Sequence, residues 1–226
     1  MSQLEFDIGE LVIYKNNQLI AFNKPAGLPV TSDKTGDKAM DQLGEIYCQS
    51  KLGLVHRLDR PASGAVLFAR NESALAQLNE QFRERQVEKV YLAAVGNRPT
   101  EMDGQLVHYL RRDGRQNKAI AFPGPKKGAK RAELSYRYLE SSDHYHLLEI
   151  RLHTGRHHQI RAQLADIGCP IKGDVKYGFR RGNPDRSIHL HAWKLSFKHP
   201  VSGQPETVTA PLPQEDPVWS AFELIQ

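Results

Sequence analysis

The 226-residue chain has 39% hydrophobic and 25% charged residues, an ordinary globular composition that excludes wholesale disorder. A chain of this length can bury roughly 70–75% of its unfolded surface, so its core needs no disulfide or metal. Cys48 and Cys169 are far apart and lack a C-x-x-C spacing, which excludes a disulfide framework and a cysteine zinc site. The sequence has neither a run approaching the roughly 20 apolar residues that span a bilayer nor a secretory signal. We therefore expect a cytoplasmic protein that does not associate with membranes.

The net charge of +5 is concentrated in one segment. Residues 111–131 carry eight basic side chains against Asp113 alone, so this segment has a charge of +7 and the remainder −2. The basic residues are Arg111, Arg112, Arg115, Lys118, Lys126, Lys127, Lys130 and Arg131. Its glycines and prolines predict a long loop. This loop is either a solvated surface or an arm that contacts phosphate, because clustered cations displace counterions from nucleic acids.

The predicted elements follow from apolar patterns. Short apolar runs bounded by turn residues predict strands over residues 11–14, 19–22, 65–68, 87–95, 134–138, 145–152, 188–192, 195–198 and 206–210. Helices are predicted over residues 37–47, 71–85 and 156–167, with a further short helix at the C-terminus. Asn71 is a suitable N-cap for the second helix. Strands and helices do not alternate regularly, so we expect a single α+β domain over residues 1–226, with a mixed, largely antiparallel sheet flanked by helices.

The segment HRLDRPASG, residues 56–64, places Asp59 between two arginines, Arg57 and Arg60. Neighbouring cations favour the ionised carboxylate. An ionised carboxylate suits a nucleophile, a base or a group that stabilises a cation, and it does not suit a general acid. Taken alone, the pattern is also consistent with an ion pair that fixes a loop.

The segment HTGRHHQIR, residues 153–161, predicts a helix with a basic start. A Thr-Gly turn opens this helix, and the free N–H groups and positive dipole end of a helix attract anions. Arg161 follows His157 by four residues and His158 by three, so these side chains are expected on adjoining faces. The alternative is a helix with a solvated basic face.

The ten histidines raise the question of a metal site. The H-x-H pairs at residues 144–146 and 189–191 place two imidazoles on one face of a strand. No cysteine or carboxylate cluster completes a ligand set, so we expect no metal. A Walker pattern and a G-x-S-x-G turn are also absent from the sequence.

Several segments together resemble the RluA-type pseudouridine synthases. HRLDRPASG is similar to that family's catalytic motif, HRLD-x-x-TSG. Further similar segments follow in the family's order: NKPAGLPV (23–30), VEKVYLAAVG (87–96), TGRHHQIRAQLADIGCPIKGDVKYG (154–178), LHAWKLSFKHPVSG (190–203) and APLP (210–213). The sequence departs from the family pattern at Ala62, where Thr is usual, and at Gln163, where His is common.

The resemblance implies the pseudouridine synthase fold and the isomerisation of a uridine in RNA to pseudouridine, without a cofactor. It places the catalytic aspartate at Asp59, the tyrosine that packs against the target base at Tyr91, and the arginine that pairs with the aspartate at Arg161. Arg156 is a second candidate for that arginine. With RNA as the partner, the residues expected to bind it are Arg57, Arg60, Arg156, Lys126, Lys127, Lys130 and Arg131. Many family members carry an S4-like RNA-binding domain, for which we expect no counterpart in this chain.

Two other functions remain open at this point. A non-catalytic RNA-binding or folding factor on the same scaffold would bind RNA without isomerising it. An enzyme that hydrolyses a glycosidic bond in nucleic acid would need a general acid, a role that an ionised Asp59 does not suit. We expect a ribosomal or transfer RNA stem-loop as substrate, a monomeric protein and no obligate protein partner.

Overall fold

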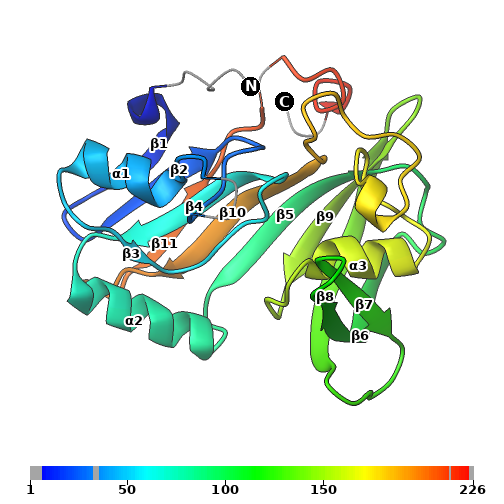
Figure 1. Ribbon diagram of the computed structural model, residues 1–226, viewed down its shortest axis with the longest axis horizontal. Coiled ribbons are helices and arrows are strands. Elements are labelled where there is room, and N and C mark those ends of the chain that lie inside the picture. Colours follow the sequence, from blue (N-terminus) through cyan, green and yellow to red (C-terminus); the bar gives the residue numbers. More distant parts are fainter. Residues whose placement is uncertain (1–6, 33–35, 214, 224–226) are drawn as a thin grey trace. The chain divides into compact units, whose positions relative to one another are not determined.

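The computed structural model describes residues 7–32, 36–213 and 215–223. The chain forms two compact units (Figure 1). Unit 1 comprises Met1–Val87 and Ala192–Pro211, and unit 2 comprises Glu88–His191 and Leu212–Gln226. Within the described residues, no helix has the length and apolar character needed to cross a bilayer.

Unit 1 is built on strands in the order β1-β2-β4-β10, with β3 beside β4 and β11 beside β10. These strands are β1 (Val12–Lys15), β2 (Leu19–Lys24), β3 (Gly53–Leu54), β4 (Ser63–Ala69), β10 (Leu190–Lys198) and β11 (Pro205–Thr209). The ladders β1–β2, β2–β4, β3–β4 and β10–β11 are antiparallel. The helical elements are η1 (Ile8–Leu11), α1 (Met40–Cys48) and α2 (Glu72–Arg83).

Helix α2 closes the core of unit 1. Its Ala74 and Leu78 are buried against Leu67 of β4 and Leu195 of β10. The helix begins where the sequence predicts, because the Asn71 side chain accepts a hydrogen bond from Ala74 N at 2.9 Å. The apolar spacing of this helix therefore reflects packing against the sheet.

Unit 2 is built on strands in the order β5-β9-β8-β6-β7. These are β5 (Glu88–Val95), β6 (Asp103–Asp113), β7 (Lys118–Phe122), β8 (Lys130–Ser141) and β9 (His146–Leu152), all joined by antiparallel ladders. Helix α3 (Gln159–Asp166) packs on β6 and β7 (Figure 1). Its Ala162 meets Leu110, Ala119 and Ala132. The short helix η2 (Val175–Tyr177) follows α3.

The α+β class and the sheet flanked by helices are confirmed. The prediction of one long loop over residues 111–131 is wrong, because these residues form the end of β6, all of β7 and the start of β8. Gly114 and the prolines lie in the two connections, whereas Ala119, buried beneath α3, gives β7 an apolar side. The small alanine side chains make a weak apolar signal, which the surrounding charges obscure.

Other elements also differ from prediction. Helix α3 begins at Gln159 instead of residue 156, because His158 has a left-handed φ of 49° that a continuing helix does not allow. The two strands predicted over 188–198 form the single strand β10. Among the described residues after β11, the chain forms turns in place of the expected α-helix.

Candidate active site

Asp59 lies in the loop between β3 and β4 of unit 1. The backbone of the neighbouring Arg60 is tied to the segment after β2, because Arg60 O accepts hydrogen bonds from Gly27 N at 2.8 Å and from Lys24 Nζ at 3.2 Å. Asp59 O accepts from Ala62 N at 3.1 Å, which closes a turn around the partly buried aspartate. The backbone that carries the carboxylate is thus held on both sides.

Lys24, at the end of β2, also holds the Asp59 loop, a role that no sequence motif indicated. Its side chain is fully buried, and Nζ donates to the carbonyl oxygens of Pro25 at 2.9 Å, Leu28 at 2.8 Å and Arg60 at 3.2 Å. Burial lowers the pKa of Lys24 to about 7, against the opposing effect of the Asp59 charge. The signal in the sequence was a lysine ending an apolar strand directly before a proline.

The two ends of the Asp59 loop are anchored to regular structure. His56 Nε2 accepts from Leu67 N at 3.0 Å, and its ring stacks on Phe82 of α2 with centroids 5.2 Å apart. Gly64 has a φ of 115°, and a Cβ there would lie 2.4 Å from Ala192 O. Only glycine allows β4 to approach β10 this closely. The close packing of the two strands therefore explains why residue 64 is a glycine.

The two arginines beside Asp59 differ in their surroundings. The Arg57 side chain is exposed to solvent. Arg60 Nε donates to Gly27 O at 2.8 Å, and its guanidinium pairs with Asp37. These contacts support a loop-fixing role for Arg60, in addition to the RNA binding predicted for it.

Arg161 and Tyr91 both lie in unit 2. Tyr91 is largely buried on β5, directly opposite Ile150 of β9. Arg161 of α3 forms a buried two-point ion pair with Asp174, with Nε–Oδ2 at 2.7 Å and Nη2–Oδ1 at 2.9 Å. The Tyr177 ring centroid lies 5.0 Å from the Arg161 guanidinium carbon. Neither Asp174 nor Tyr177 was singled out from the sequence, although both lie in the segment KGDVKYG.

His158, the residue before α3, is packed against two other rings. His158 Nδ1 lies 3.0 Å from the Tyr177 hydroxyl, and the His157 and His158 rings stack with centroids 3.8 Å apart. Burial, followed by the nearby Arg161 charge, lowers the pKa of His158 to about 2. His158 is therefore neutral at physiological pH.

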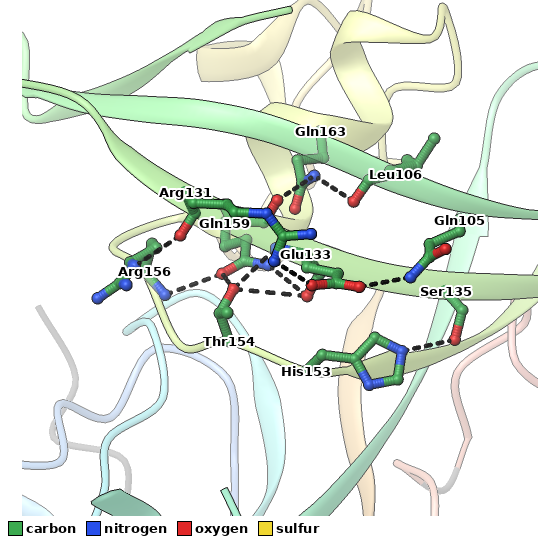
Figure 2. A network of polar contacts seen from close by, with 11 residues as sticks. Gln105, Leu106, Arg131, Glu133, Ser135, His153, Thr154, Arg156, Gln159 and Gln163 are labelled. Carbon is green, nitrogen blue, oxygen red and sulfur yellow. Dashed lines mark hydrogen bonds and ion pairs between the residues drawn. The ribbon is translucent and has the colours of Figure 1, made fainter. Parts of the chain in front are cut away.

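The loop before α3 is fixed to β8 by a polar network (Figure 2). Gln159 Oε1 accepts from Thr154 Oγ1 at 2.7 Å and from Arg156 N at 3.0 Å, while Gln159 Nε2 donates to Glu133 O at 3.0 Å. Arg156 Nε donates to Arg131 O at 3.1 Å. The network therefore holds two of the predicted RNA-binding arginines next to each other.

The remaining predicted RNA-binding residues lie around the start of β8. Lys126 and Lys127 are exposed in the connection between β7 and β8, and Lys130 is exposed at the first position of β8. The Arg131 guanidinium pairs with Glu133, which neutralises part of its charge. Among the described residues, no group of three or more His, Cys, Asp or Glu side chains is arranged to hold a metal ion.

The sequence that forms these loops and strands matches a known protein family. The chain belongs to the RNA pseudouridylate synthases, whose family model matches residues 18–166. It is 33% identical over 88% of its length to tRNA pseudouridine synthase C of Pectobacterium carotovorum subsp. carotovorum. It is 32% identical over 90% of its length to ribosomal large subunit pseudouridine synthase D of Neisseria meningitidis serogroup A. The chain spans 58% of the length of each of these two relatives.

The fold comparison agrees with the sequence comparison. The structure of the human RNA pseudouridylate synthase domain containing 4 protein superposes with a TM-score of 0.75 at 25% identity. That match covers 92% of this chain and 90% of the human chain.

Proposed function

We propose that this protein isomerises a specific uridine to pseudouridine in a structured ribosomal or transfer RNA. The observation that carries the proposal is the Asp59 loop, which has the family's HRLD sequence and is tied by Lys24 and Arg60 to the segment after β2. Relatives named for transfer and ribosomal RNA support these two substrate classes. We further propose that both units act as one catalytic domain, in the cytoplasm and as a monomer.

The reaction rearranges one nucleotide. The bond between uracil N1 and ribose C1′ breaks, the base turns, and C5 bonds to C1′. The proton on C5 leaves and N1 gains one, so atoms balance and no cofactor is consumed. The ionised Asp59 either attacks C1′, attacks C6 or abstracts a sugar proton. Tyr91 packs against the base and assists removal of the C5 proton, since tyrosine offers a π face and a polar tip. The resemblance to the family gives Arg161 the role of the arginine that pairs with the catalytic aspartate.

The target uridine must leave the RNA stack, which costs about a few kcal/mol. A stem-loop lowers this cost because loop bases are already unpaired. The exposed Arg57 fills the vacated space or holds a phosphate. Lys126, Lys127, Lys130 and the two arginines of the β8 network contact the RNA backbone, which positions the substrate without reading bases.

Release of tritium from RNA labelled at C5 of uridine tests this function. Ribosomal and transfer RNA from a strain lacking the gene are assayed separately. We expect the wild-type protein to release tritium from one fraction and Asp59→Asn to release none while binding that RNA with similar affinity. Asp143→Asn, in the exposed turn before β9, is the matched control and keeps activity.

The products separate the alternatives. RNA binding by the wild-type protein without tritium release from either fraction would contradict the proposal and indicate a non-catalytic RNA-binding or folding factor. Free uracil among the products would indicate hydrolysis of the glycosidic bond. Tritium release by Asp59→Asn would remove Asp59 from the mechanism.

A further inference from the structure

Strand β6 presents one face to α3 and the other to solvent. His108 and Leu110 are buried on the α3 side, whereas Val107 and Arg111, which alternate with them, are exposed. The solvent side of β6, β7 and β8 is called the outer face below. It includes Val107, Tyr109, Arg111, Ile120, Phe122, Arg131 and Glu133.

The aromatic and basic side chains of the outer face are in register. Tyr109 lies directly opposite Phe122 of β7 on one side and Arg131 of β8 on the other, so these three form a row across the strands. In the next row Arg111 lies opposite Ile120, and the Arg111 guanidinium carbon is 5.2 Å from the Phe122 ring centroid. Neighbouring strands are about 4.8 Å apart, which puts the two rings within reach of consecutive bases.

The outer face is unusually apolar for a solvated sheet. Exposed sides of antiparallel sheets are normally polar, yet Val107 and Ile120 are 38% and 39% exposed. Arg111 and Arg131 lie on the same face, and the exposed Lys126 and Lys127 lie in the connection that follows Phe122. All four belong to the segment with a charge of +7. Aromatic rings framed by cations are the composition of surfaces that bind unpaired RNA, because bases stack on rings and phosphates pair with cations.

We propose that the outer face binds an unpaired segment of the substrate RNA by stacking bases on Tyr109 and Phe122. This inference rests on the proposed function, which supplies RNA as the partner. The high positive charge favours a polyanion over a second copy of this chain. Glu133 also lies on this face and pairs with Arg131, so Arg111 and the two lysines of the connection provide most of the attraction.

The outer face lies on the opposite side of the sheet of unit 2 from Tyr91. Tyr91 and Tyr136 both lie opposite Ile150, which places them on one face. Tyr136 shares that face with Ala132, which packs beneath α3. RNA stacked on Tyr109 is therefore a segment other than the target uridine, and the outer face contributes to affinity and not to the chemical step.

Fluorescence anisotropy with a labelled 12-nucleotide oligouridylate tests the surface. Tyr109→Thr/Phe122→Thr keeps strand propensity and is expected to weaken binding about tenfold or more, from the loss of two stacking contacts. Its salt dependence should match that of the wild type, whereas Arg111→Gln should flatten the slope. Tyr109→Phe keeps the ring and the affinity, and Val201→Ala, at a residue 68% exposed in unit 1, leaves binding unchanged. Far-UV circular dichroism melts verify folding of every variant.

Photocrosslinking of 5-iodouridine oligouridylate gives a second readout. We expect crosslinked peptides that contain Tyr109 or Phe122. Full affinity of the double threonine variant, or crosslinks confined to other segments, would overturn the proposal. A wild-type dimer that the double variant abolishes would show instead that a second copy covers the face.

Different results would refute the proposed function and the RNA-binding role of the outer face. Wild-type protein that binds oligouridylate through Tyr109 and Phe122 but releases no tritium would refute the proposed function and leave the surface standing. Tritium release that is accompanied by normal binding in the double variant would refute the surface alone. With an active substrate, the double variant should raise KM while kcat stays within about twofold.

Discussion

Arg161 and Asp174 form a two-point ion pair whose side chains are only 4% and 1% exposed. The pair joins α3 to the residue that precedes η2, and the Tyr177 ring lies against its cationic partner. Asp174 and Tyr177 therefore restrict the orientation of the Arg161 guanidinium. A guanidinium held by two hydrogen bonds and a ring has little freedom to change its orientation.

Removing the charge of Asp174 should destabilise the protein strongly. Asp174→Asn removes the charge of one partner of a buried ion pair, which typically costs about 3–5 kcal/mol. The free energy of unfolding in urea is the measurement. Glu88→Gln breaks the exposed pair with Arg151 and should cost less than about 1 kcal/mol. Equal losses of unfolding free energy in the two variants would show that the buried pair stabilises the protein no more than the exposed pair does.

Neutralising the cations around the start of β8 should weaken RNA binding mainly at low salt. The variant replaces Lys126, Lys127, Lys130 and Arg131 with glutamine. Each lost phosphate contact should reduce the slope of log K against log salt by about 0.7–0.9, and Arg131 should contribute least because Glu133 already pairs with it. Lys51→Gln, at an exposed lysine of unit 1, is the control. An unchanged slope would show that these cations do not contact phosphate.

Gly64→Ala should be far more costly than Gly203→Ala. Both glycines have positive φ, 115° and 70°, so alanine is strained at each. Only at Gly64 does a Cβ meet backbone, at 2.4 Å from Ala192 O, whereas Gly203 has open space around it. We expect a loss of about 1 kcal/mol at Gly203 and at least about 3 kcal/mol at Gly64. Thermal melts of both variants provide the comparison, and similar melting temperatures would contradict the close approach.

Lys24 should make stability depend on pH. Burial holds its pKa near 7 in the folded protein, below the ordinary value of 10.5. Between these two values the unfolded chain binds a proton that the folded chain lacks, so the contribution of Lys24 to stability rises with pH. The wild type should gain stability relative to Lys24→Met by roughly 1 kcal/mol per pH unit above pH 7. Urea unfolding of both proteins at pH 6.5, 7.5 and 8.5 measures the difference, and parallel curves would show that Lys24 stays protonated.

Helices and strands were predicted correctly where residues adjacent in the sequence carry the pattern. The hairpin β1–β2 and the helix after Asn71 follow from apolar runs, turn residues and one capping side chain. Strand β7 was missed because alanines supply its buried side, and small side chains give a weak apolar signal. Strand β6 was also missed, and β8 was predicted only over residues 134–138. The early start predicted for α3 failed because the left-handed His158 is stabilised by contacts with other segments.

Residue order and short motifs were enough to predict the fold class and the family, and they place Asp59 in the family's HRLD motif. Only the tertiary structure showed that Lys24 binds three carbonyl oxygens, that Asp174 holds Arg161, and that Arg60 pairs with Asp37. It also showed that Tyr109 and Phe122 are neighbours on one sheet face. Such partners are separated by many residues, and their meeting depends on strand register and burial, which are properties of the whole folded chain.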